Sequence, residues 1–214
     1  MITSAESAHI MPIWLEVSAM CISGFFGGEV AAKRGAPILG VLIGGLIFGL
    51  GGGVVRDLML NVMPAAIANW YLLPAVGLAV LLGGACSRFI SQTGLPILWI
   101  QALALGMLVL IGCDKASHFG ISVYAVVAMG VITAMAGGSI LDVLSGTRAA
   151  LLNQGAWHLT SLVAGAVCFV ILEHFNLPAL AGIGTVITVV ASRLISAHLG
   201  WQCPEFPKGN SENP

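Results

Sequence analysis

The chain has 214 residues, of which 58% are hydrophobic and only 8% charged, and its formal net charge is −1. A water-soluble globular domain carries charge on about a quarter of its residues, so this composition excludes that class and indicates an integral membrane protein. The sequence also lacks a cluster of basic residues, which excludes nucleic-acid binding as its main role.

Seven apolar stretches follow one another along the chain, each near the ~20 residues that a helix needs to cross a hydrocarbon core of ~30 Å. Glycine, proline and asparagine separate them, as expected for short loops. The sequence therefore predicts an all-α membrane protein with seven transmembrane helices, at about residues 12–32, 37–60, 70–90, 96–115, 121–144, 155–173 and 178–199.

The segments outside these stretches are short and polar. Residues 1–10 contain no Lys or Arg, which indicates that no cleavable signal peptide precedes the first span. Residues 200–214 are expected to form a soluble tail.

Basic residues predict the orientation, because cytoplasmic loops retain Lys and Arg. With the N-terminus outside and the C-terminus cytoplasmic, six of the eight basic residues lie at or near the cytoplasmic face: Lys33, Arg34, Arg88, Arg148, Arg193 and Lys208. Arg56, inside the second stretch, and Lys115, at the outer end of the fourth, do not fit this rule and need another role.

An internal repeat appears when the chain is aligned with itself so that Gly27 meets Gly112, a shift that we call the repeat offset. Gly27-Gly28-Glu29 then aligns with Gly112-Cys113-Asp114, and the stretch 51–58 (GGGVVRDL) aligns with 136–143 (AGGSILDV). A unit of three spans reverses direction in its second copy, so the sequence predicts a 3+3 inverted repeat, at residues 12–92 and 96–174, with a seventh helix at 178–199. Inverted repeats with interrupted helices are typical of transport proteins.

The matched glycine runs are poor helix interior and indicate a kink, a break or a close helix contact in the second and fifth spans. They comprise Gly51, Gly52, Gly53, Gly137 and Gly138. Packing alone is the alternative, because small residues are common where membrane helices meet.

Charged groups inside a bilayer are paired or face a wet cavity, because each costs about 2.5 to 3.5 kcal/mol at the membrane centre. Six such groups are expected to line a polar pathway, together with the hydroxyl of Ser139: Glu29, Arg56, Asp57, Asp114, Lys115 and Asp142. The alternative is that these charged groups form ion pairs that only fix the register of the helices. Neighbours on a helix point about 100° apart, so Arg56 and Asp57 are expected to find partners elsewhere, with Arg56 near Asp114.

Other chemistries find little support. The five cysteines are scattered, with none in a CxxC pair, and are interpreted as packing residues, so neither a metal site nor a disulfide is expected. His158 is interpreted as an interfacial residue at the start of the sixth span. No hydrolase or phosphate-binding motif is present, so we expect neither an enzyme nor a cofactor.

The Gly-Gly-Gly run followed by Arg-Asp at 51–57, with a weaker copy in the fifth span, resembles the trimeric intracellular cation (TRIC) channel family, and its prokaryotic members in particular. The resemblance extends over about residues 12–199. It implies a potassium-permeable channel in a bacterial or archaeal plasma membrane, assembled as a homotrimer with a pore in each protomer. It also implies that the glycine runs kink the second and fifth spans and that Lys115 takes part in gating.

The chain departs from the pattern in the fifth span, where AGGSILD at 136–142 lacks both the third glycine and the arginine. The main alternative is a small neutral amino acid transporter, because some bacterial relatives with the same pattern are described as taking up glycine. A structural subunit, whose charges would be tightly paired and dry, is a third possibility.

Overall fold

A computed structural model of the protein describes residues 12–89, 95–147 and 158–200. Eight helices lie within these ranges: α1 (Ile13–Lys33), α2 (Ile38–Met59), α3 (Ala65–Ala68), α4 (Leu72–Cys86), α5 (Leu95–His118), α6 (Val123–Leu144), α7 (His158–His174) and α8 (Pro178–Leu199). The protein is thus an all-α membrane protein, as expected from its composition.

Seven of these helices occupy the positions of the predicted spans, and the sequence analysis missed only the four-residue α3. Five helices are long and apolar enough to cross a bilayer, namely α1, α2, α5, α6 and α8, whereas α4 and α7 have 15 and 17 residues. Predictions that concern residues 1–10, the tail from 201, Arg148 and Lys208 lie outside the described residues.

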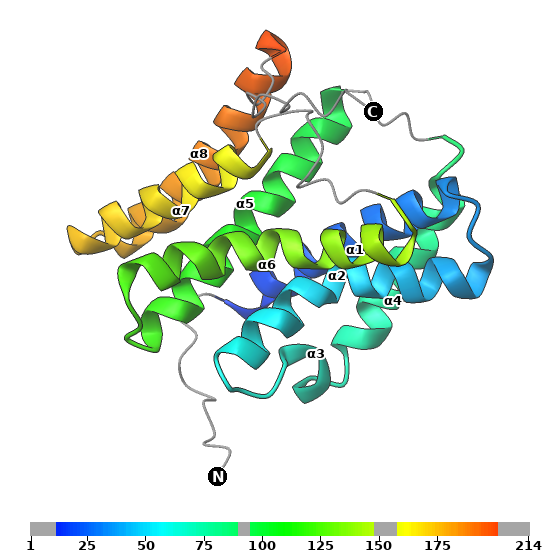
Figure 1. The fold of residues 1–214 in the computed structure, drawn as a ribbon, viewed down its shortest axis with the longest axis horizontal. Coiled ribbons are helices and arrows are strands. Elements are labelled where there is room, and N and C mark those ends of the chain that lie inside the picture. Colours follow the sequence, from blue (N-terminus) through cyan, green and yellow to red (C-terminus); the bar gives the residue numbers. More distant parts are fainter. Residues whose placement is uncertain (1–11, 90–94, 148–157, 201–214) are drawn as a thin grey trace, which may run out of the picture.

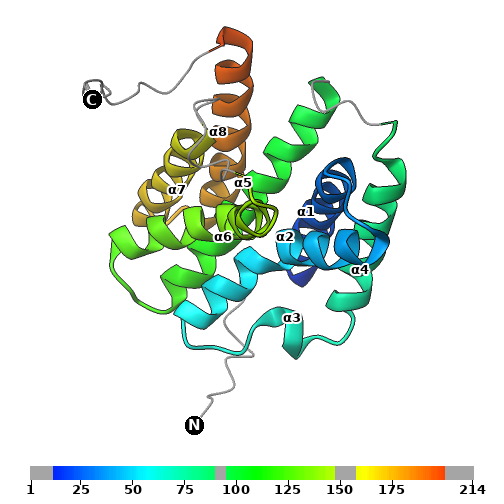
Figure 2. The same cartoon turned by 45° about the vertical axis from the view of Figure 1, so that its right-hand side comes forward.

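The helices form two groups that meet in the middle of the molecule (Figure 1). α1, α2 and α4 pack on one another on one side, and α5, α6, α7 and α8 pack on the other. The groups touch through α2 against α6 and through α1 against α5. Figure 2 shows α6 between the α7–α8 pair and the α1–α4 pair, so α2 and α6 occupy the centre.

Each group has its own apolar core. Buried residues of α1, α2 and α4, including Met20, Leu50 and Val76, form one cluster. Val109, Leu162 and further residues of α5 to α8 form another. The large exposed side chains are mostly apolar, as expected for a surface that faces lipid.

Glycines make the central contact between α2 and α6 very close. A Cβ atom on Gly52 would collide with the carbonyl oxygen of Thr133, and a Cβ atom on Gly137 would collide with the carbonyl oxygen of Phe48. Both helices run without interruption through their glycine runs, so the runs do not break them. Close contact, one of the readings that the sequence allowed, is therefore what these glycines provide.

The turns that follow the helices recur at the repeat offset. Gly35, shortly after α1, has φ 80°, and its counterpart Gly120, shortly after α5, has φ 62°. Asn61 after α2 has φ 56°, and its counterpart Gly146 after α6 has φ 66°. These left-handed residues end a helix by returning the chain to its last carbonyls.

Candidate functional site: a central cavity and a buried ion-pair cluster

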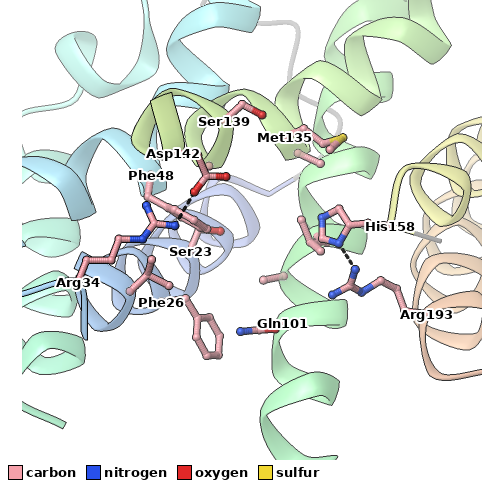
Figure 3. Close-up of a pocket in the computed structure, with 15 residues that line it drawn as sticks. Ser23, Phe26, Arg34, Phe48, Gln101, Met135, Ser139, Asp142, His158 and Arg193 are labelled. Carbon is pink, nitrogen blue, oxygen red and sulfur yellow. Dashed lines mark hydrogen bonds and ion pairs between the residues drawn. The ribbon is translucent and has the colours of Figure 1, made fainter. Parts of the chain in front are cut away.

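A cavity with a volume of about 220 Å³ lies between the two groups of helices. Figure 3 shows its side chains, which come from α1, α2, α5, α6, α7, α8 and the residue after α1. Apolar side chains such as Phe26 and Phe48 make up part of the wall, and the polar members are Ser23, Arg34, Gln101, Ser139, Asp142, His158 and Arg193.

One wall of the cavity carries an ion pair between the two groups of helices. Arg34, directly after α1, donates from Nη2 to Oδ1 of Asp142, near the end of α6, over 2.6 Å. The side chain of Arg34 is 30% exposed and that of Asp142 is 10% exposed. The sequence had placed Arg34 in a loop at the cytoplasmic face and had given Asp142 no partner.

The opposite wall carries a second basic group (Figure 3). Arg193 of α8 contacts Nδ1 of His158, at the start of α7, and Gln101 of α5 lies on the same cavity. A guanidinium can only donate hydrogen bonds, so this ring nitrogen of His158 is the acceptor. The sequence had assigned His158 to the membrane interface and had not singled out Arg193 as a cavity residue.

A second polar cluster is buried near the far end of α2. The guanidinium of Arg56 donates from Nη2 to Oε1 of Glu16 over 2.7 Å and from Nε to Oδ1 of Asp57 over 2.8 Å. Lys115 of α5 donates to the same Asp57 oxygen over 2.8 Å. Oδ2 of Asp57 accepts the backbone N–H of Ala65, at the start of α3, over 2.9 Å.

The cluster balances its charges internally. Glu16 and Asp57 are the acids and Arg56 and Lys115 the bases, so the four formal charges sum to zero. Arg56 and Asp57 are completely buried, and the side chain of Lys115 is 11% exposed. Buried charges persist when they are paired in this way, because removal from water without a partner is very costly.

Two expectations about this cluster are wrong. Arg56 does pair with Asp57, because the long arginine side chain bends back far enough to overcome the 100° between neighbouring positions. The described partners of Arg56 are Glu16 and Asp57 rather than Asp114. Glu16, which the sequence analysis overlooked, was detectable as a carboxylate inside the first apolar stretch.

The remaining expected pathway residues lie elsewhere. Glu29 is fully buried on α1 and pairs with Lys33 one turn later. Asp114 faces a different pocket, which Glu173 and His118 also line. Of the seven polar residues singled out by sequence, the structure therefore places Ser139 and Asp142 on the central cavity and Arg56, Asp57 and Lys115 in the buried cluster.

Comparisons with known proteins bear on this arrangement. A family model described as Glycine transporter matches residues 13–85 and 98–174. The UPF0126 inner membrane protein YadS of Escherichia coli K12 is 26% identical over 202 residues, which cover 90% of this chain and 95% of YadS. A UPF0126 membrane protein of Deinococcus radiodurans is 24% identical over 201 residues, or 91% of this chain and 89% of that protein.

Solved structures share the fold. One solved structure, from work on the structural basis for conductance through TRIC cation channels, superposes with a TM-score of 0.85 at 26% sequence identity. The match covers 94% of this chain and all of the other chain. The TRIC trimeric intracellular cation channel orthologue of Rhodobacter sphaeroides has a TM-score of 0.81 and 27% identity, and covers 88% of this chain and 98% of its own. The two groups of helices and their central contact thus belong to a known channel architecture.

Proposed function

This chain belongs to the family described as Glycine transporter and has the fold of the TRIC cation channels, and from that premise we propose that it is a passive monovalent cation channel, chiefly for potassium. The observation that carries the proposal is the ion pair between Lys115 and the fully buried carboxylate of Asp57. It places a tethered ammonium group against an acid that could otherwise bind a permeating cation.

Charge balance explains how Lys115 would control flow. While the lysine stays on Asp57, the cluster is neutral and offers a free cation no net attraction. When the ammonium group withdraws, Glu16, Arg56 and Asp57 together carry a charge of −1, which favours a cation at that place. Lys115 would therefore act as the gate, with Asp57 as the cation site behind it. Ser139 and Asp142 line the central cavity, which would form another part of the pathway.

We further propose that residues 12–92 and 96–174 are two inverted copies of one unit. The contacts of Gly52 with Thr133 and of Gly137 with Phe48 support this, because the repeat offset converts each pair into the other. Matching backbone bonds add support: Val62 donates to the carbonyl of Asp57, and Thr147 donates to that of Asp142, both over 2.9 Å. We also propose that α2 and α6 are kinked at their glycine runs.

The likeness to the TRIC cation channels also supports a proposal for the oligomeric state and the membrane orientation. We propose a homotrimer with a pore within each protomer, in the inner membrane, with lipid around its apolar surface. The N-terminus would lie outside and the C-terminus in the cytoplasm, which places the Arg34 end of the molecule inside and the Lys115 end outside. Glu29 and Asp114, away from the central cavity, are proposed to support the pathway indirectly through helix packing.

Single-channel recording tests the proposal most directly. The purified protein in planar bilayers with a potassium chloride gradient should give discrete current steps whose reversal potential approaches that for potassium. Lys115→Ala should raise the open probability or conductance about tenfold, because it removes one ion-pair contact worth about 1.4 kcal/mol. Lys115→Arg, which keeps the charge, should stay near the wild type.

Two results would count against this function. Unchanged currents in Lys115→Ala would remove Lys115 as the gate. Silent bilayers for the wild type and both variants, with correctly assembled protein, would remove the channel itself.

A glycine transporter is the second candidate, favoured by the family description and by the charges on the central cavity. Arg193 and Gln101 on one wall could hold a carboxylate, and Asp142 on the other could hold an ammonium group (Figure 3). Saturable uptake of radiolabelled glycine into proteoliposomes, abolished by Arg193→Gln, would establish this function. Uptake that stays linear with concentration would exclude it.

A further inference from the structure

Asp57 and Asp142 occupy equivalent places at opposite ends of the central helix pair. The repeat offset places one exactly on the other in the aligned halves of the chain. Because α2 and α6 run in opposite directions and Gly52 faces Thr133, Asp57 lies level with about position 128 of α6. That is roughly 14 residues, or ~20 Å, from Asp142, so both acids lie within the depth of one hydrocarbon core.

Each of these acids holds a basic side chain from the helix that begins one of the two halves. Lys115, in the last turn of α5, reaches Asp57 of α2 over 2.8 Å. Arg34, directly after α1, reaches Asp142 of α6 over 2.6 Å. In both cases the base and the acid come from different halves of the chain. An ion pair between the two halves therefore occurs twice, once at each end of the α2–α6 pair.

The two basic residues differ by one helical turn. The position that matches Lys115 in the first half is Val30, which lines the central cavity together with Arg34. Four residues separate Val30 from Arg34, so they lie on the same face of the chain at this end of α1. A longer guanidinium side chain placed one turn later thus reaches the equivalent carboxylate.

From this juxtaposition we infer that Arg34 is a second gate, which closes the cavity end of the pathway by occupying Asp142 as Lys115 occupies Asp57. This inference rests on the proposed channel function and adds a control point that acts in series with Lys115. A cation crosses only when both tethered bases have left their acids. The 30% exposure of Arg34 gives its guanidinium a route into solvent, so this gate opens more readily than the buried one.

A purely structural role makes a different prediction. If the pair only fixed α1 against α6, loss of Arg34 would lower stability and leave the current through assembled channels unchanged. The position of both side chains on the cavity wall favours control of permeation, because movement of Arg34 changes the charge that an entering cation meets.

The test is single-channel recording of Arg34→Gln, alone and combined with Lys115→Ala. Arg34→Gln should raise the open probability about threefold to fivefold, as expected for a partly exposed ion pair. Gates in series multiply, so the double variant should show the product of the two single increases. Arg88→Gln is the matched control, because Arg88 is an exposed arginine after α4 outside the cavity lining, and it should behave as the wild type.

A charge exchange tests the pair itself. Arg34→Asp should open the channel further than Arg34→Gln, and adding Asp142→Arg should return the open probability to within about twofold of the wild type, because one ion pair is restored. Thermal unfolding in detergent, measured for each variant, shows that the recorded channels are folded. Failure of the exchange to restore closure would overturn the inference.

Other outcomes separate this inference from the function on which it rests. If Lys115→Ala alters the current while Arg34→Gln matches Arg88→Gln, the channel stands and the second gate is overturned. If every variant including Lys115→Ala is silent, both are overturned.

Discussion

The two ends of the α2–α6 pair carry related charges in different surroundings. At one end, Asp57 is completely buried and bonds to Arg56, Lys115 and the backbone of Ala65. At the other end, Asp142 is paired with a partly exposed arginine beside an open cavity. The same acid at equivalent positions therefore belongs to a closed network in one half and to a loose pair in the other.

Burial accounts for the difference in how firmly each end is held. Removing one partner of a buried pair leaves an uncompensated charge, which costs about 3–5 kcal/mol. At the other end, solvent reaches the side chain of Arg34, which is 30% exposed, although Asp142 itself is buried, so screening weakens this ion pair. One end of the molecule is thus suited to stability and the other to movement.

Removing the central arginine of the buried cluster should have the largest effect. Arg56→Met should lower the free energy of unfolding by about 3–5 kcal/mol, because it leaves Glu16 and Asp57 competing for Lys115 alone. Arg34→Met, the matched change at the other end, should lower it by about 1–2 kcal/mol, because solvent screens Arg34 while the buried carboxylate of Asp142 loses the guanidinium. Denaturant unfolding in detergent micelles measures both, and equal losses would show that burial does not distinguish the two ends.

The contact that joins the two ends should give an intermediate effect. Gly52→Ala forces a methyl group against the backbone of Thr133 and should cost about 1–3 kcal/mol, with parallel loss of current. Gly53→Ala meets the terminal methyl group of the flexible Met20 side chain and, at an ordinary contact distance of 4.0 Å, Nη2 of Arg56, so it should be nearly neutral. Thermal unfolding compares the two, and loss of current without loss of stability in Gly52→Ala would favour a functional kink over packing.

The smallest change to the protein tests from which side of the membrane solvent reaches each end of the α2–α6 pair. In a background without native cysteines, Ser139→Cys should react with a charged thiol reagent from the cytoplasmic side, because Ser139 lines the cavity that Arg34 adjoins. Ser117→Cys, near Lys115, should react from the outer side. Current block during one-sided addition reports the reaction, and reversed sidedness would overturn the proposed orientation.

The positions of the helices could be read from the sequence because length and hydrophobicity alone set a membrane span. The sequence did not predict α3, because its four residues, Ala65 to Ala68, are too few to show a helical period and follow a proline. α7 is described from His158, and the predicted start near 155 lies outside the described residues.

The pairing of charges was less predictable, because it depends on contacts between helices. Sequence indicated that Lys115 and Asp57 belong to a polar pathway but did not indicate that they meet. The rule that neighbours point apart failed for Arg56 because it describes where side chains leave the helix, not where a flexible guanidinium ends. The sequence did not indicate that Arg34 lines the cavity, because a basic residue in a loop is ordinarily explained by the orientation of the protein in the membrane.

The reciprocal contact of Gly52 with Thr133 and of Gly137 with Phe48 has a consequence for how the two halves can diverge. In a symmetric dimer of identical chains, every substitution would appear at both ends at once. Here both halves share one polypeptide, so each can change alone as long as the glycines that touch its counterpart are kept. The first half thus retains Arg56 beside Asp57, while the second has Leu141 beside Asp142, and a molecule with symmetric architecture acquires two unlike faces.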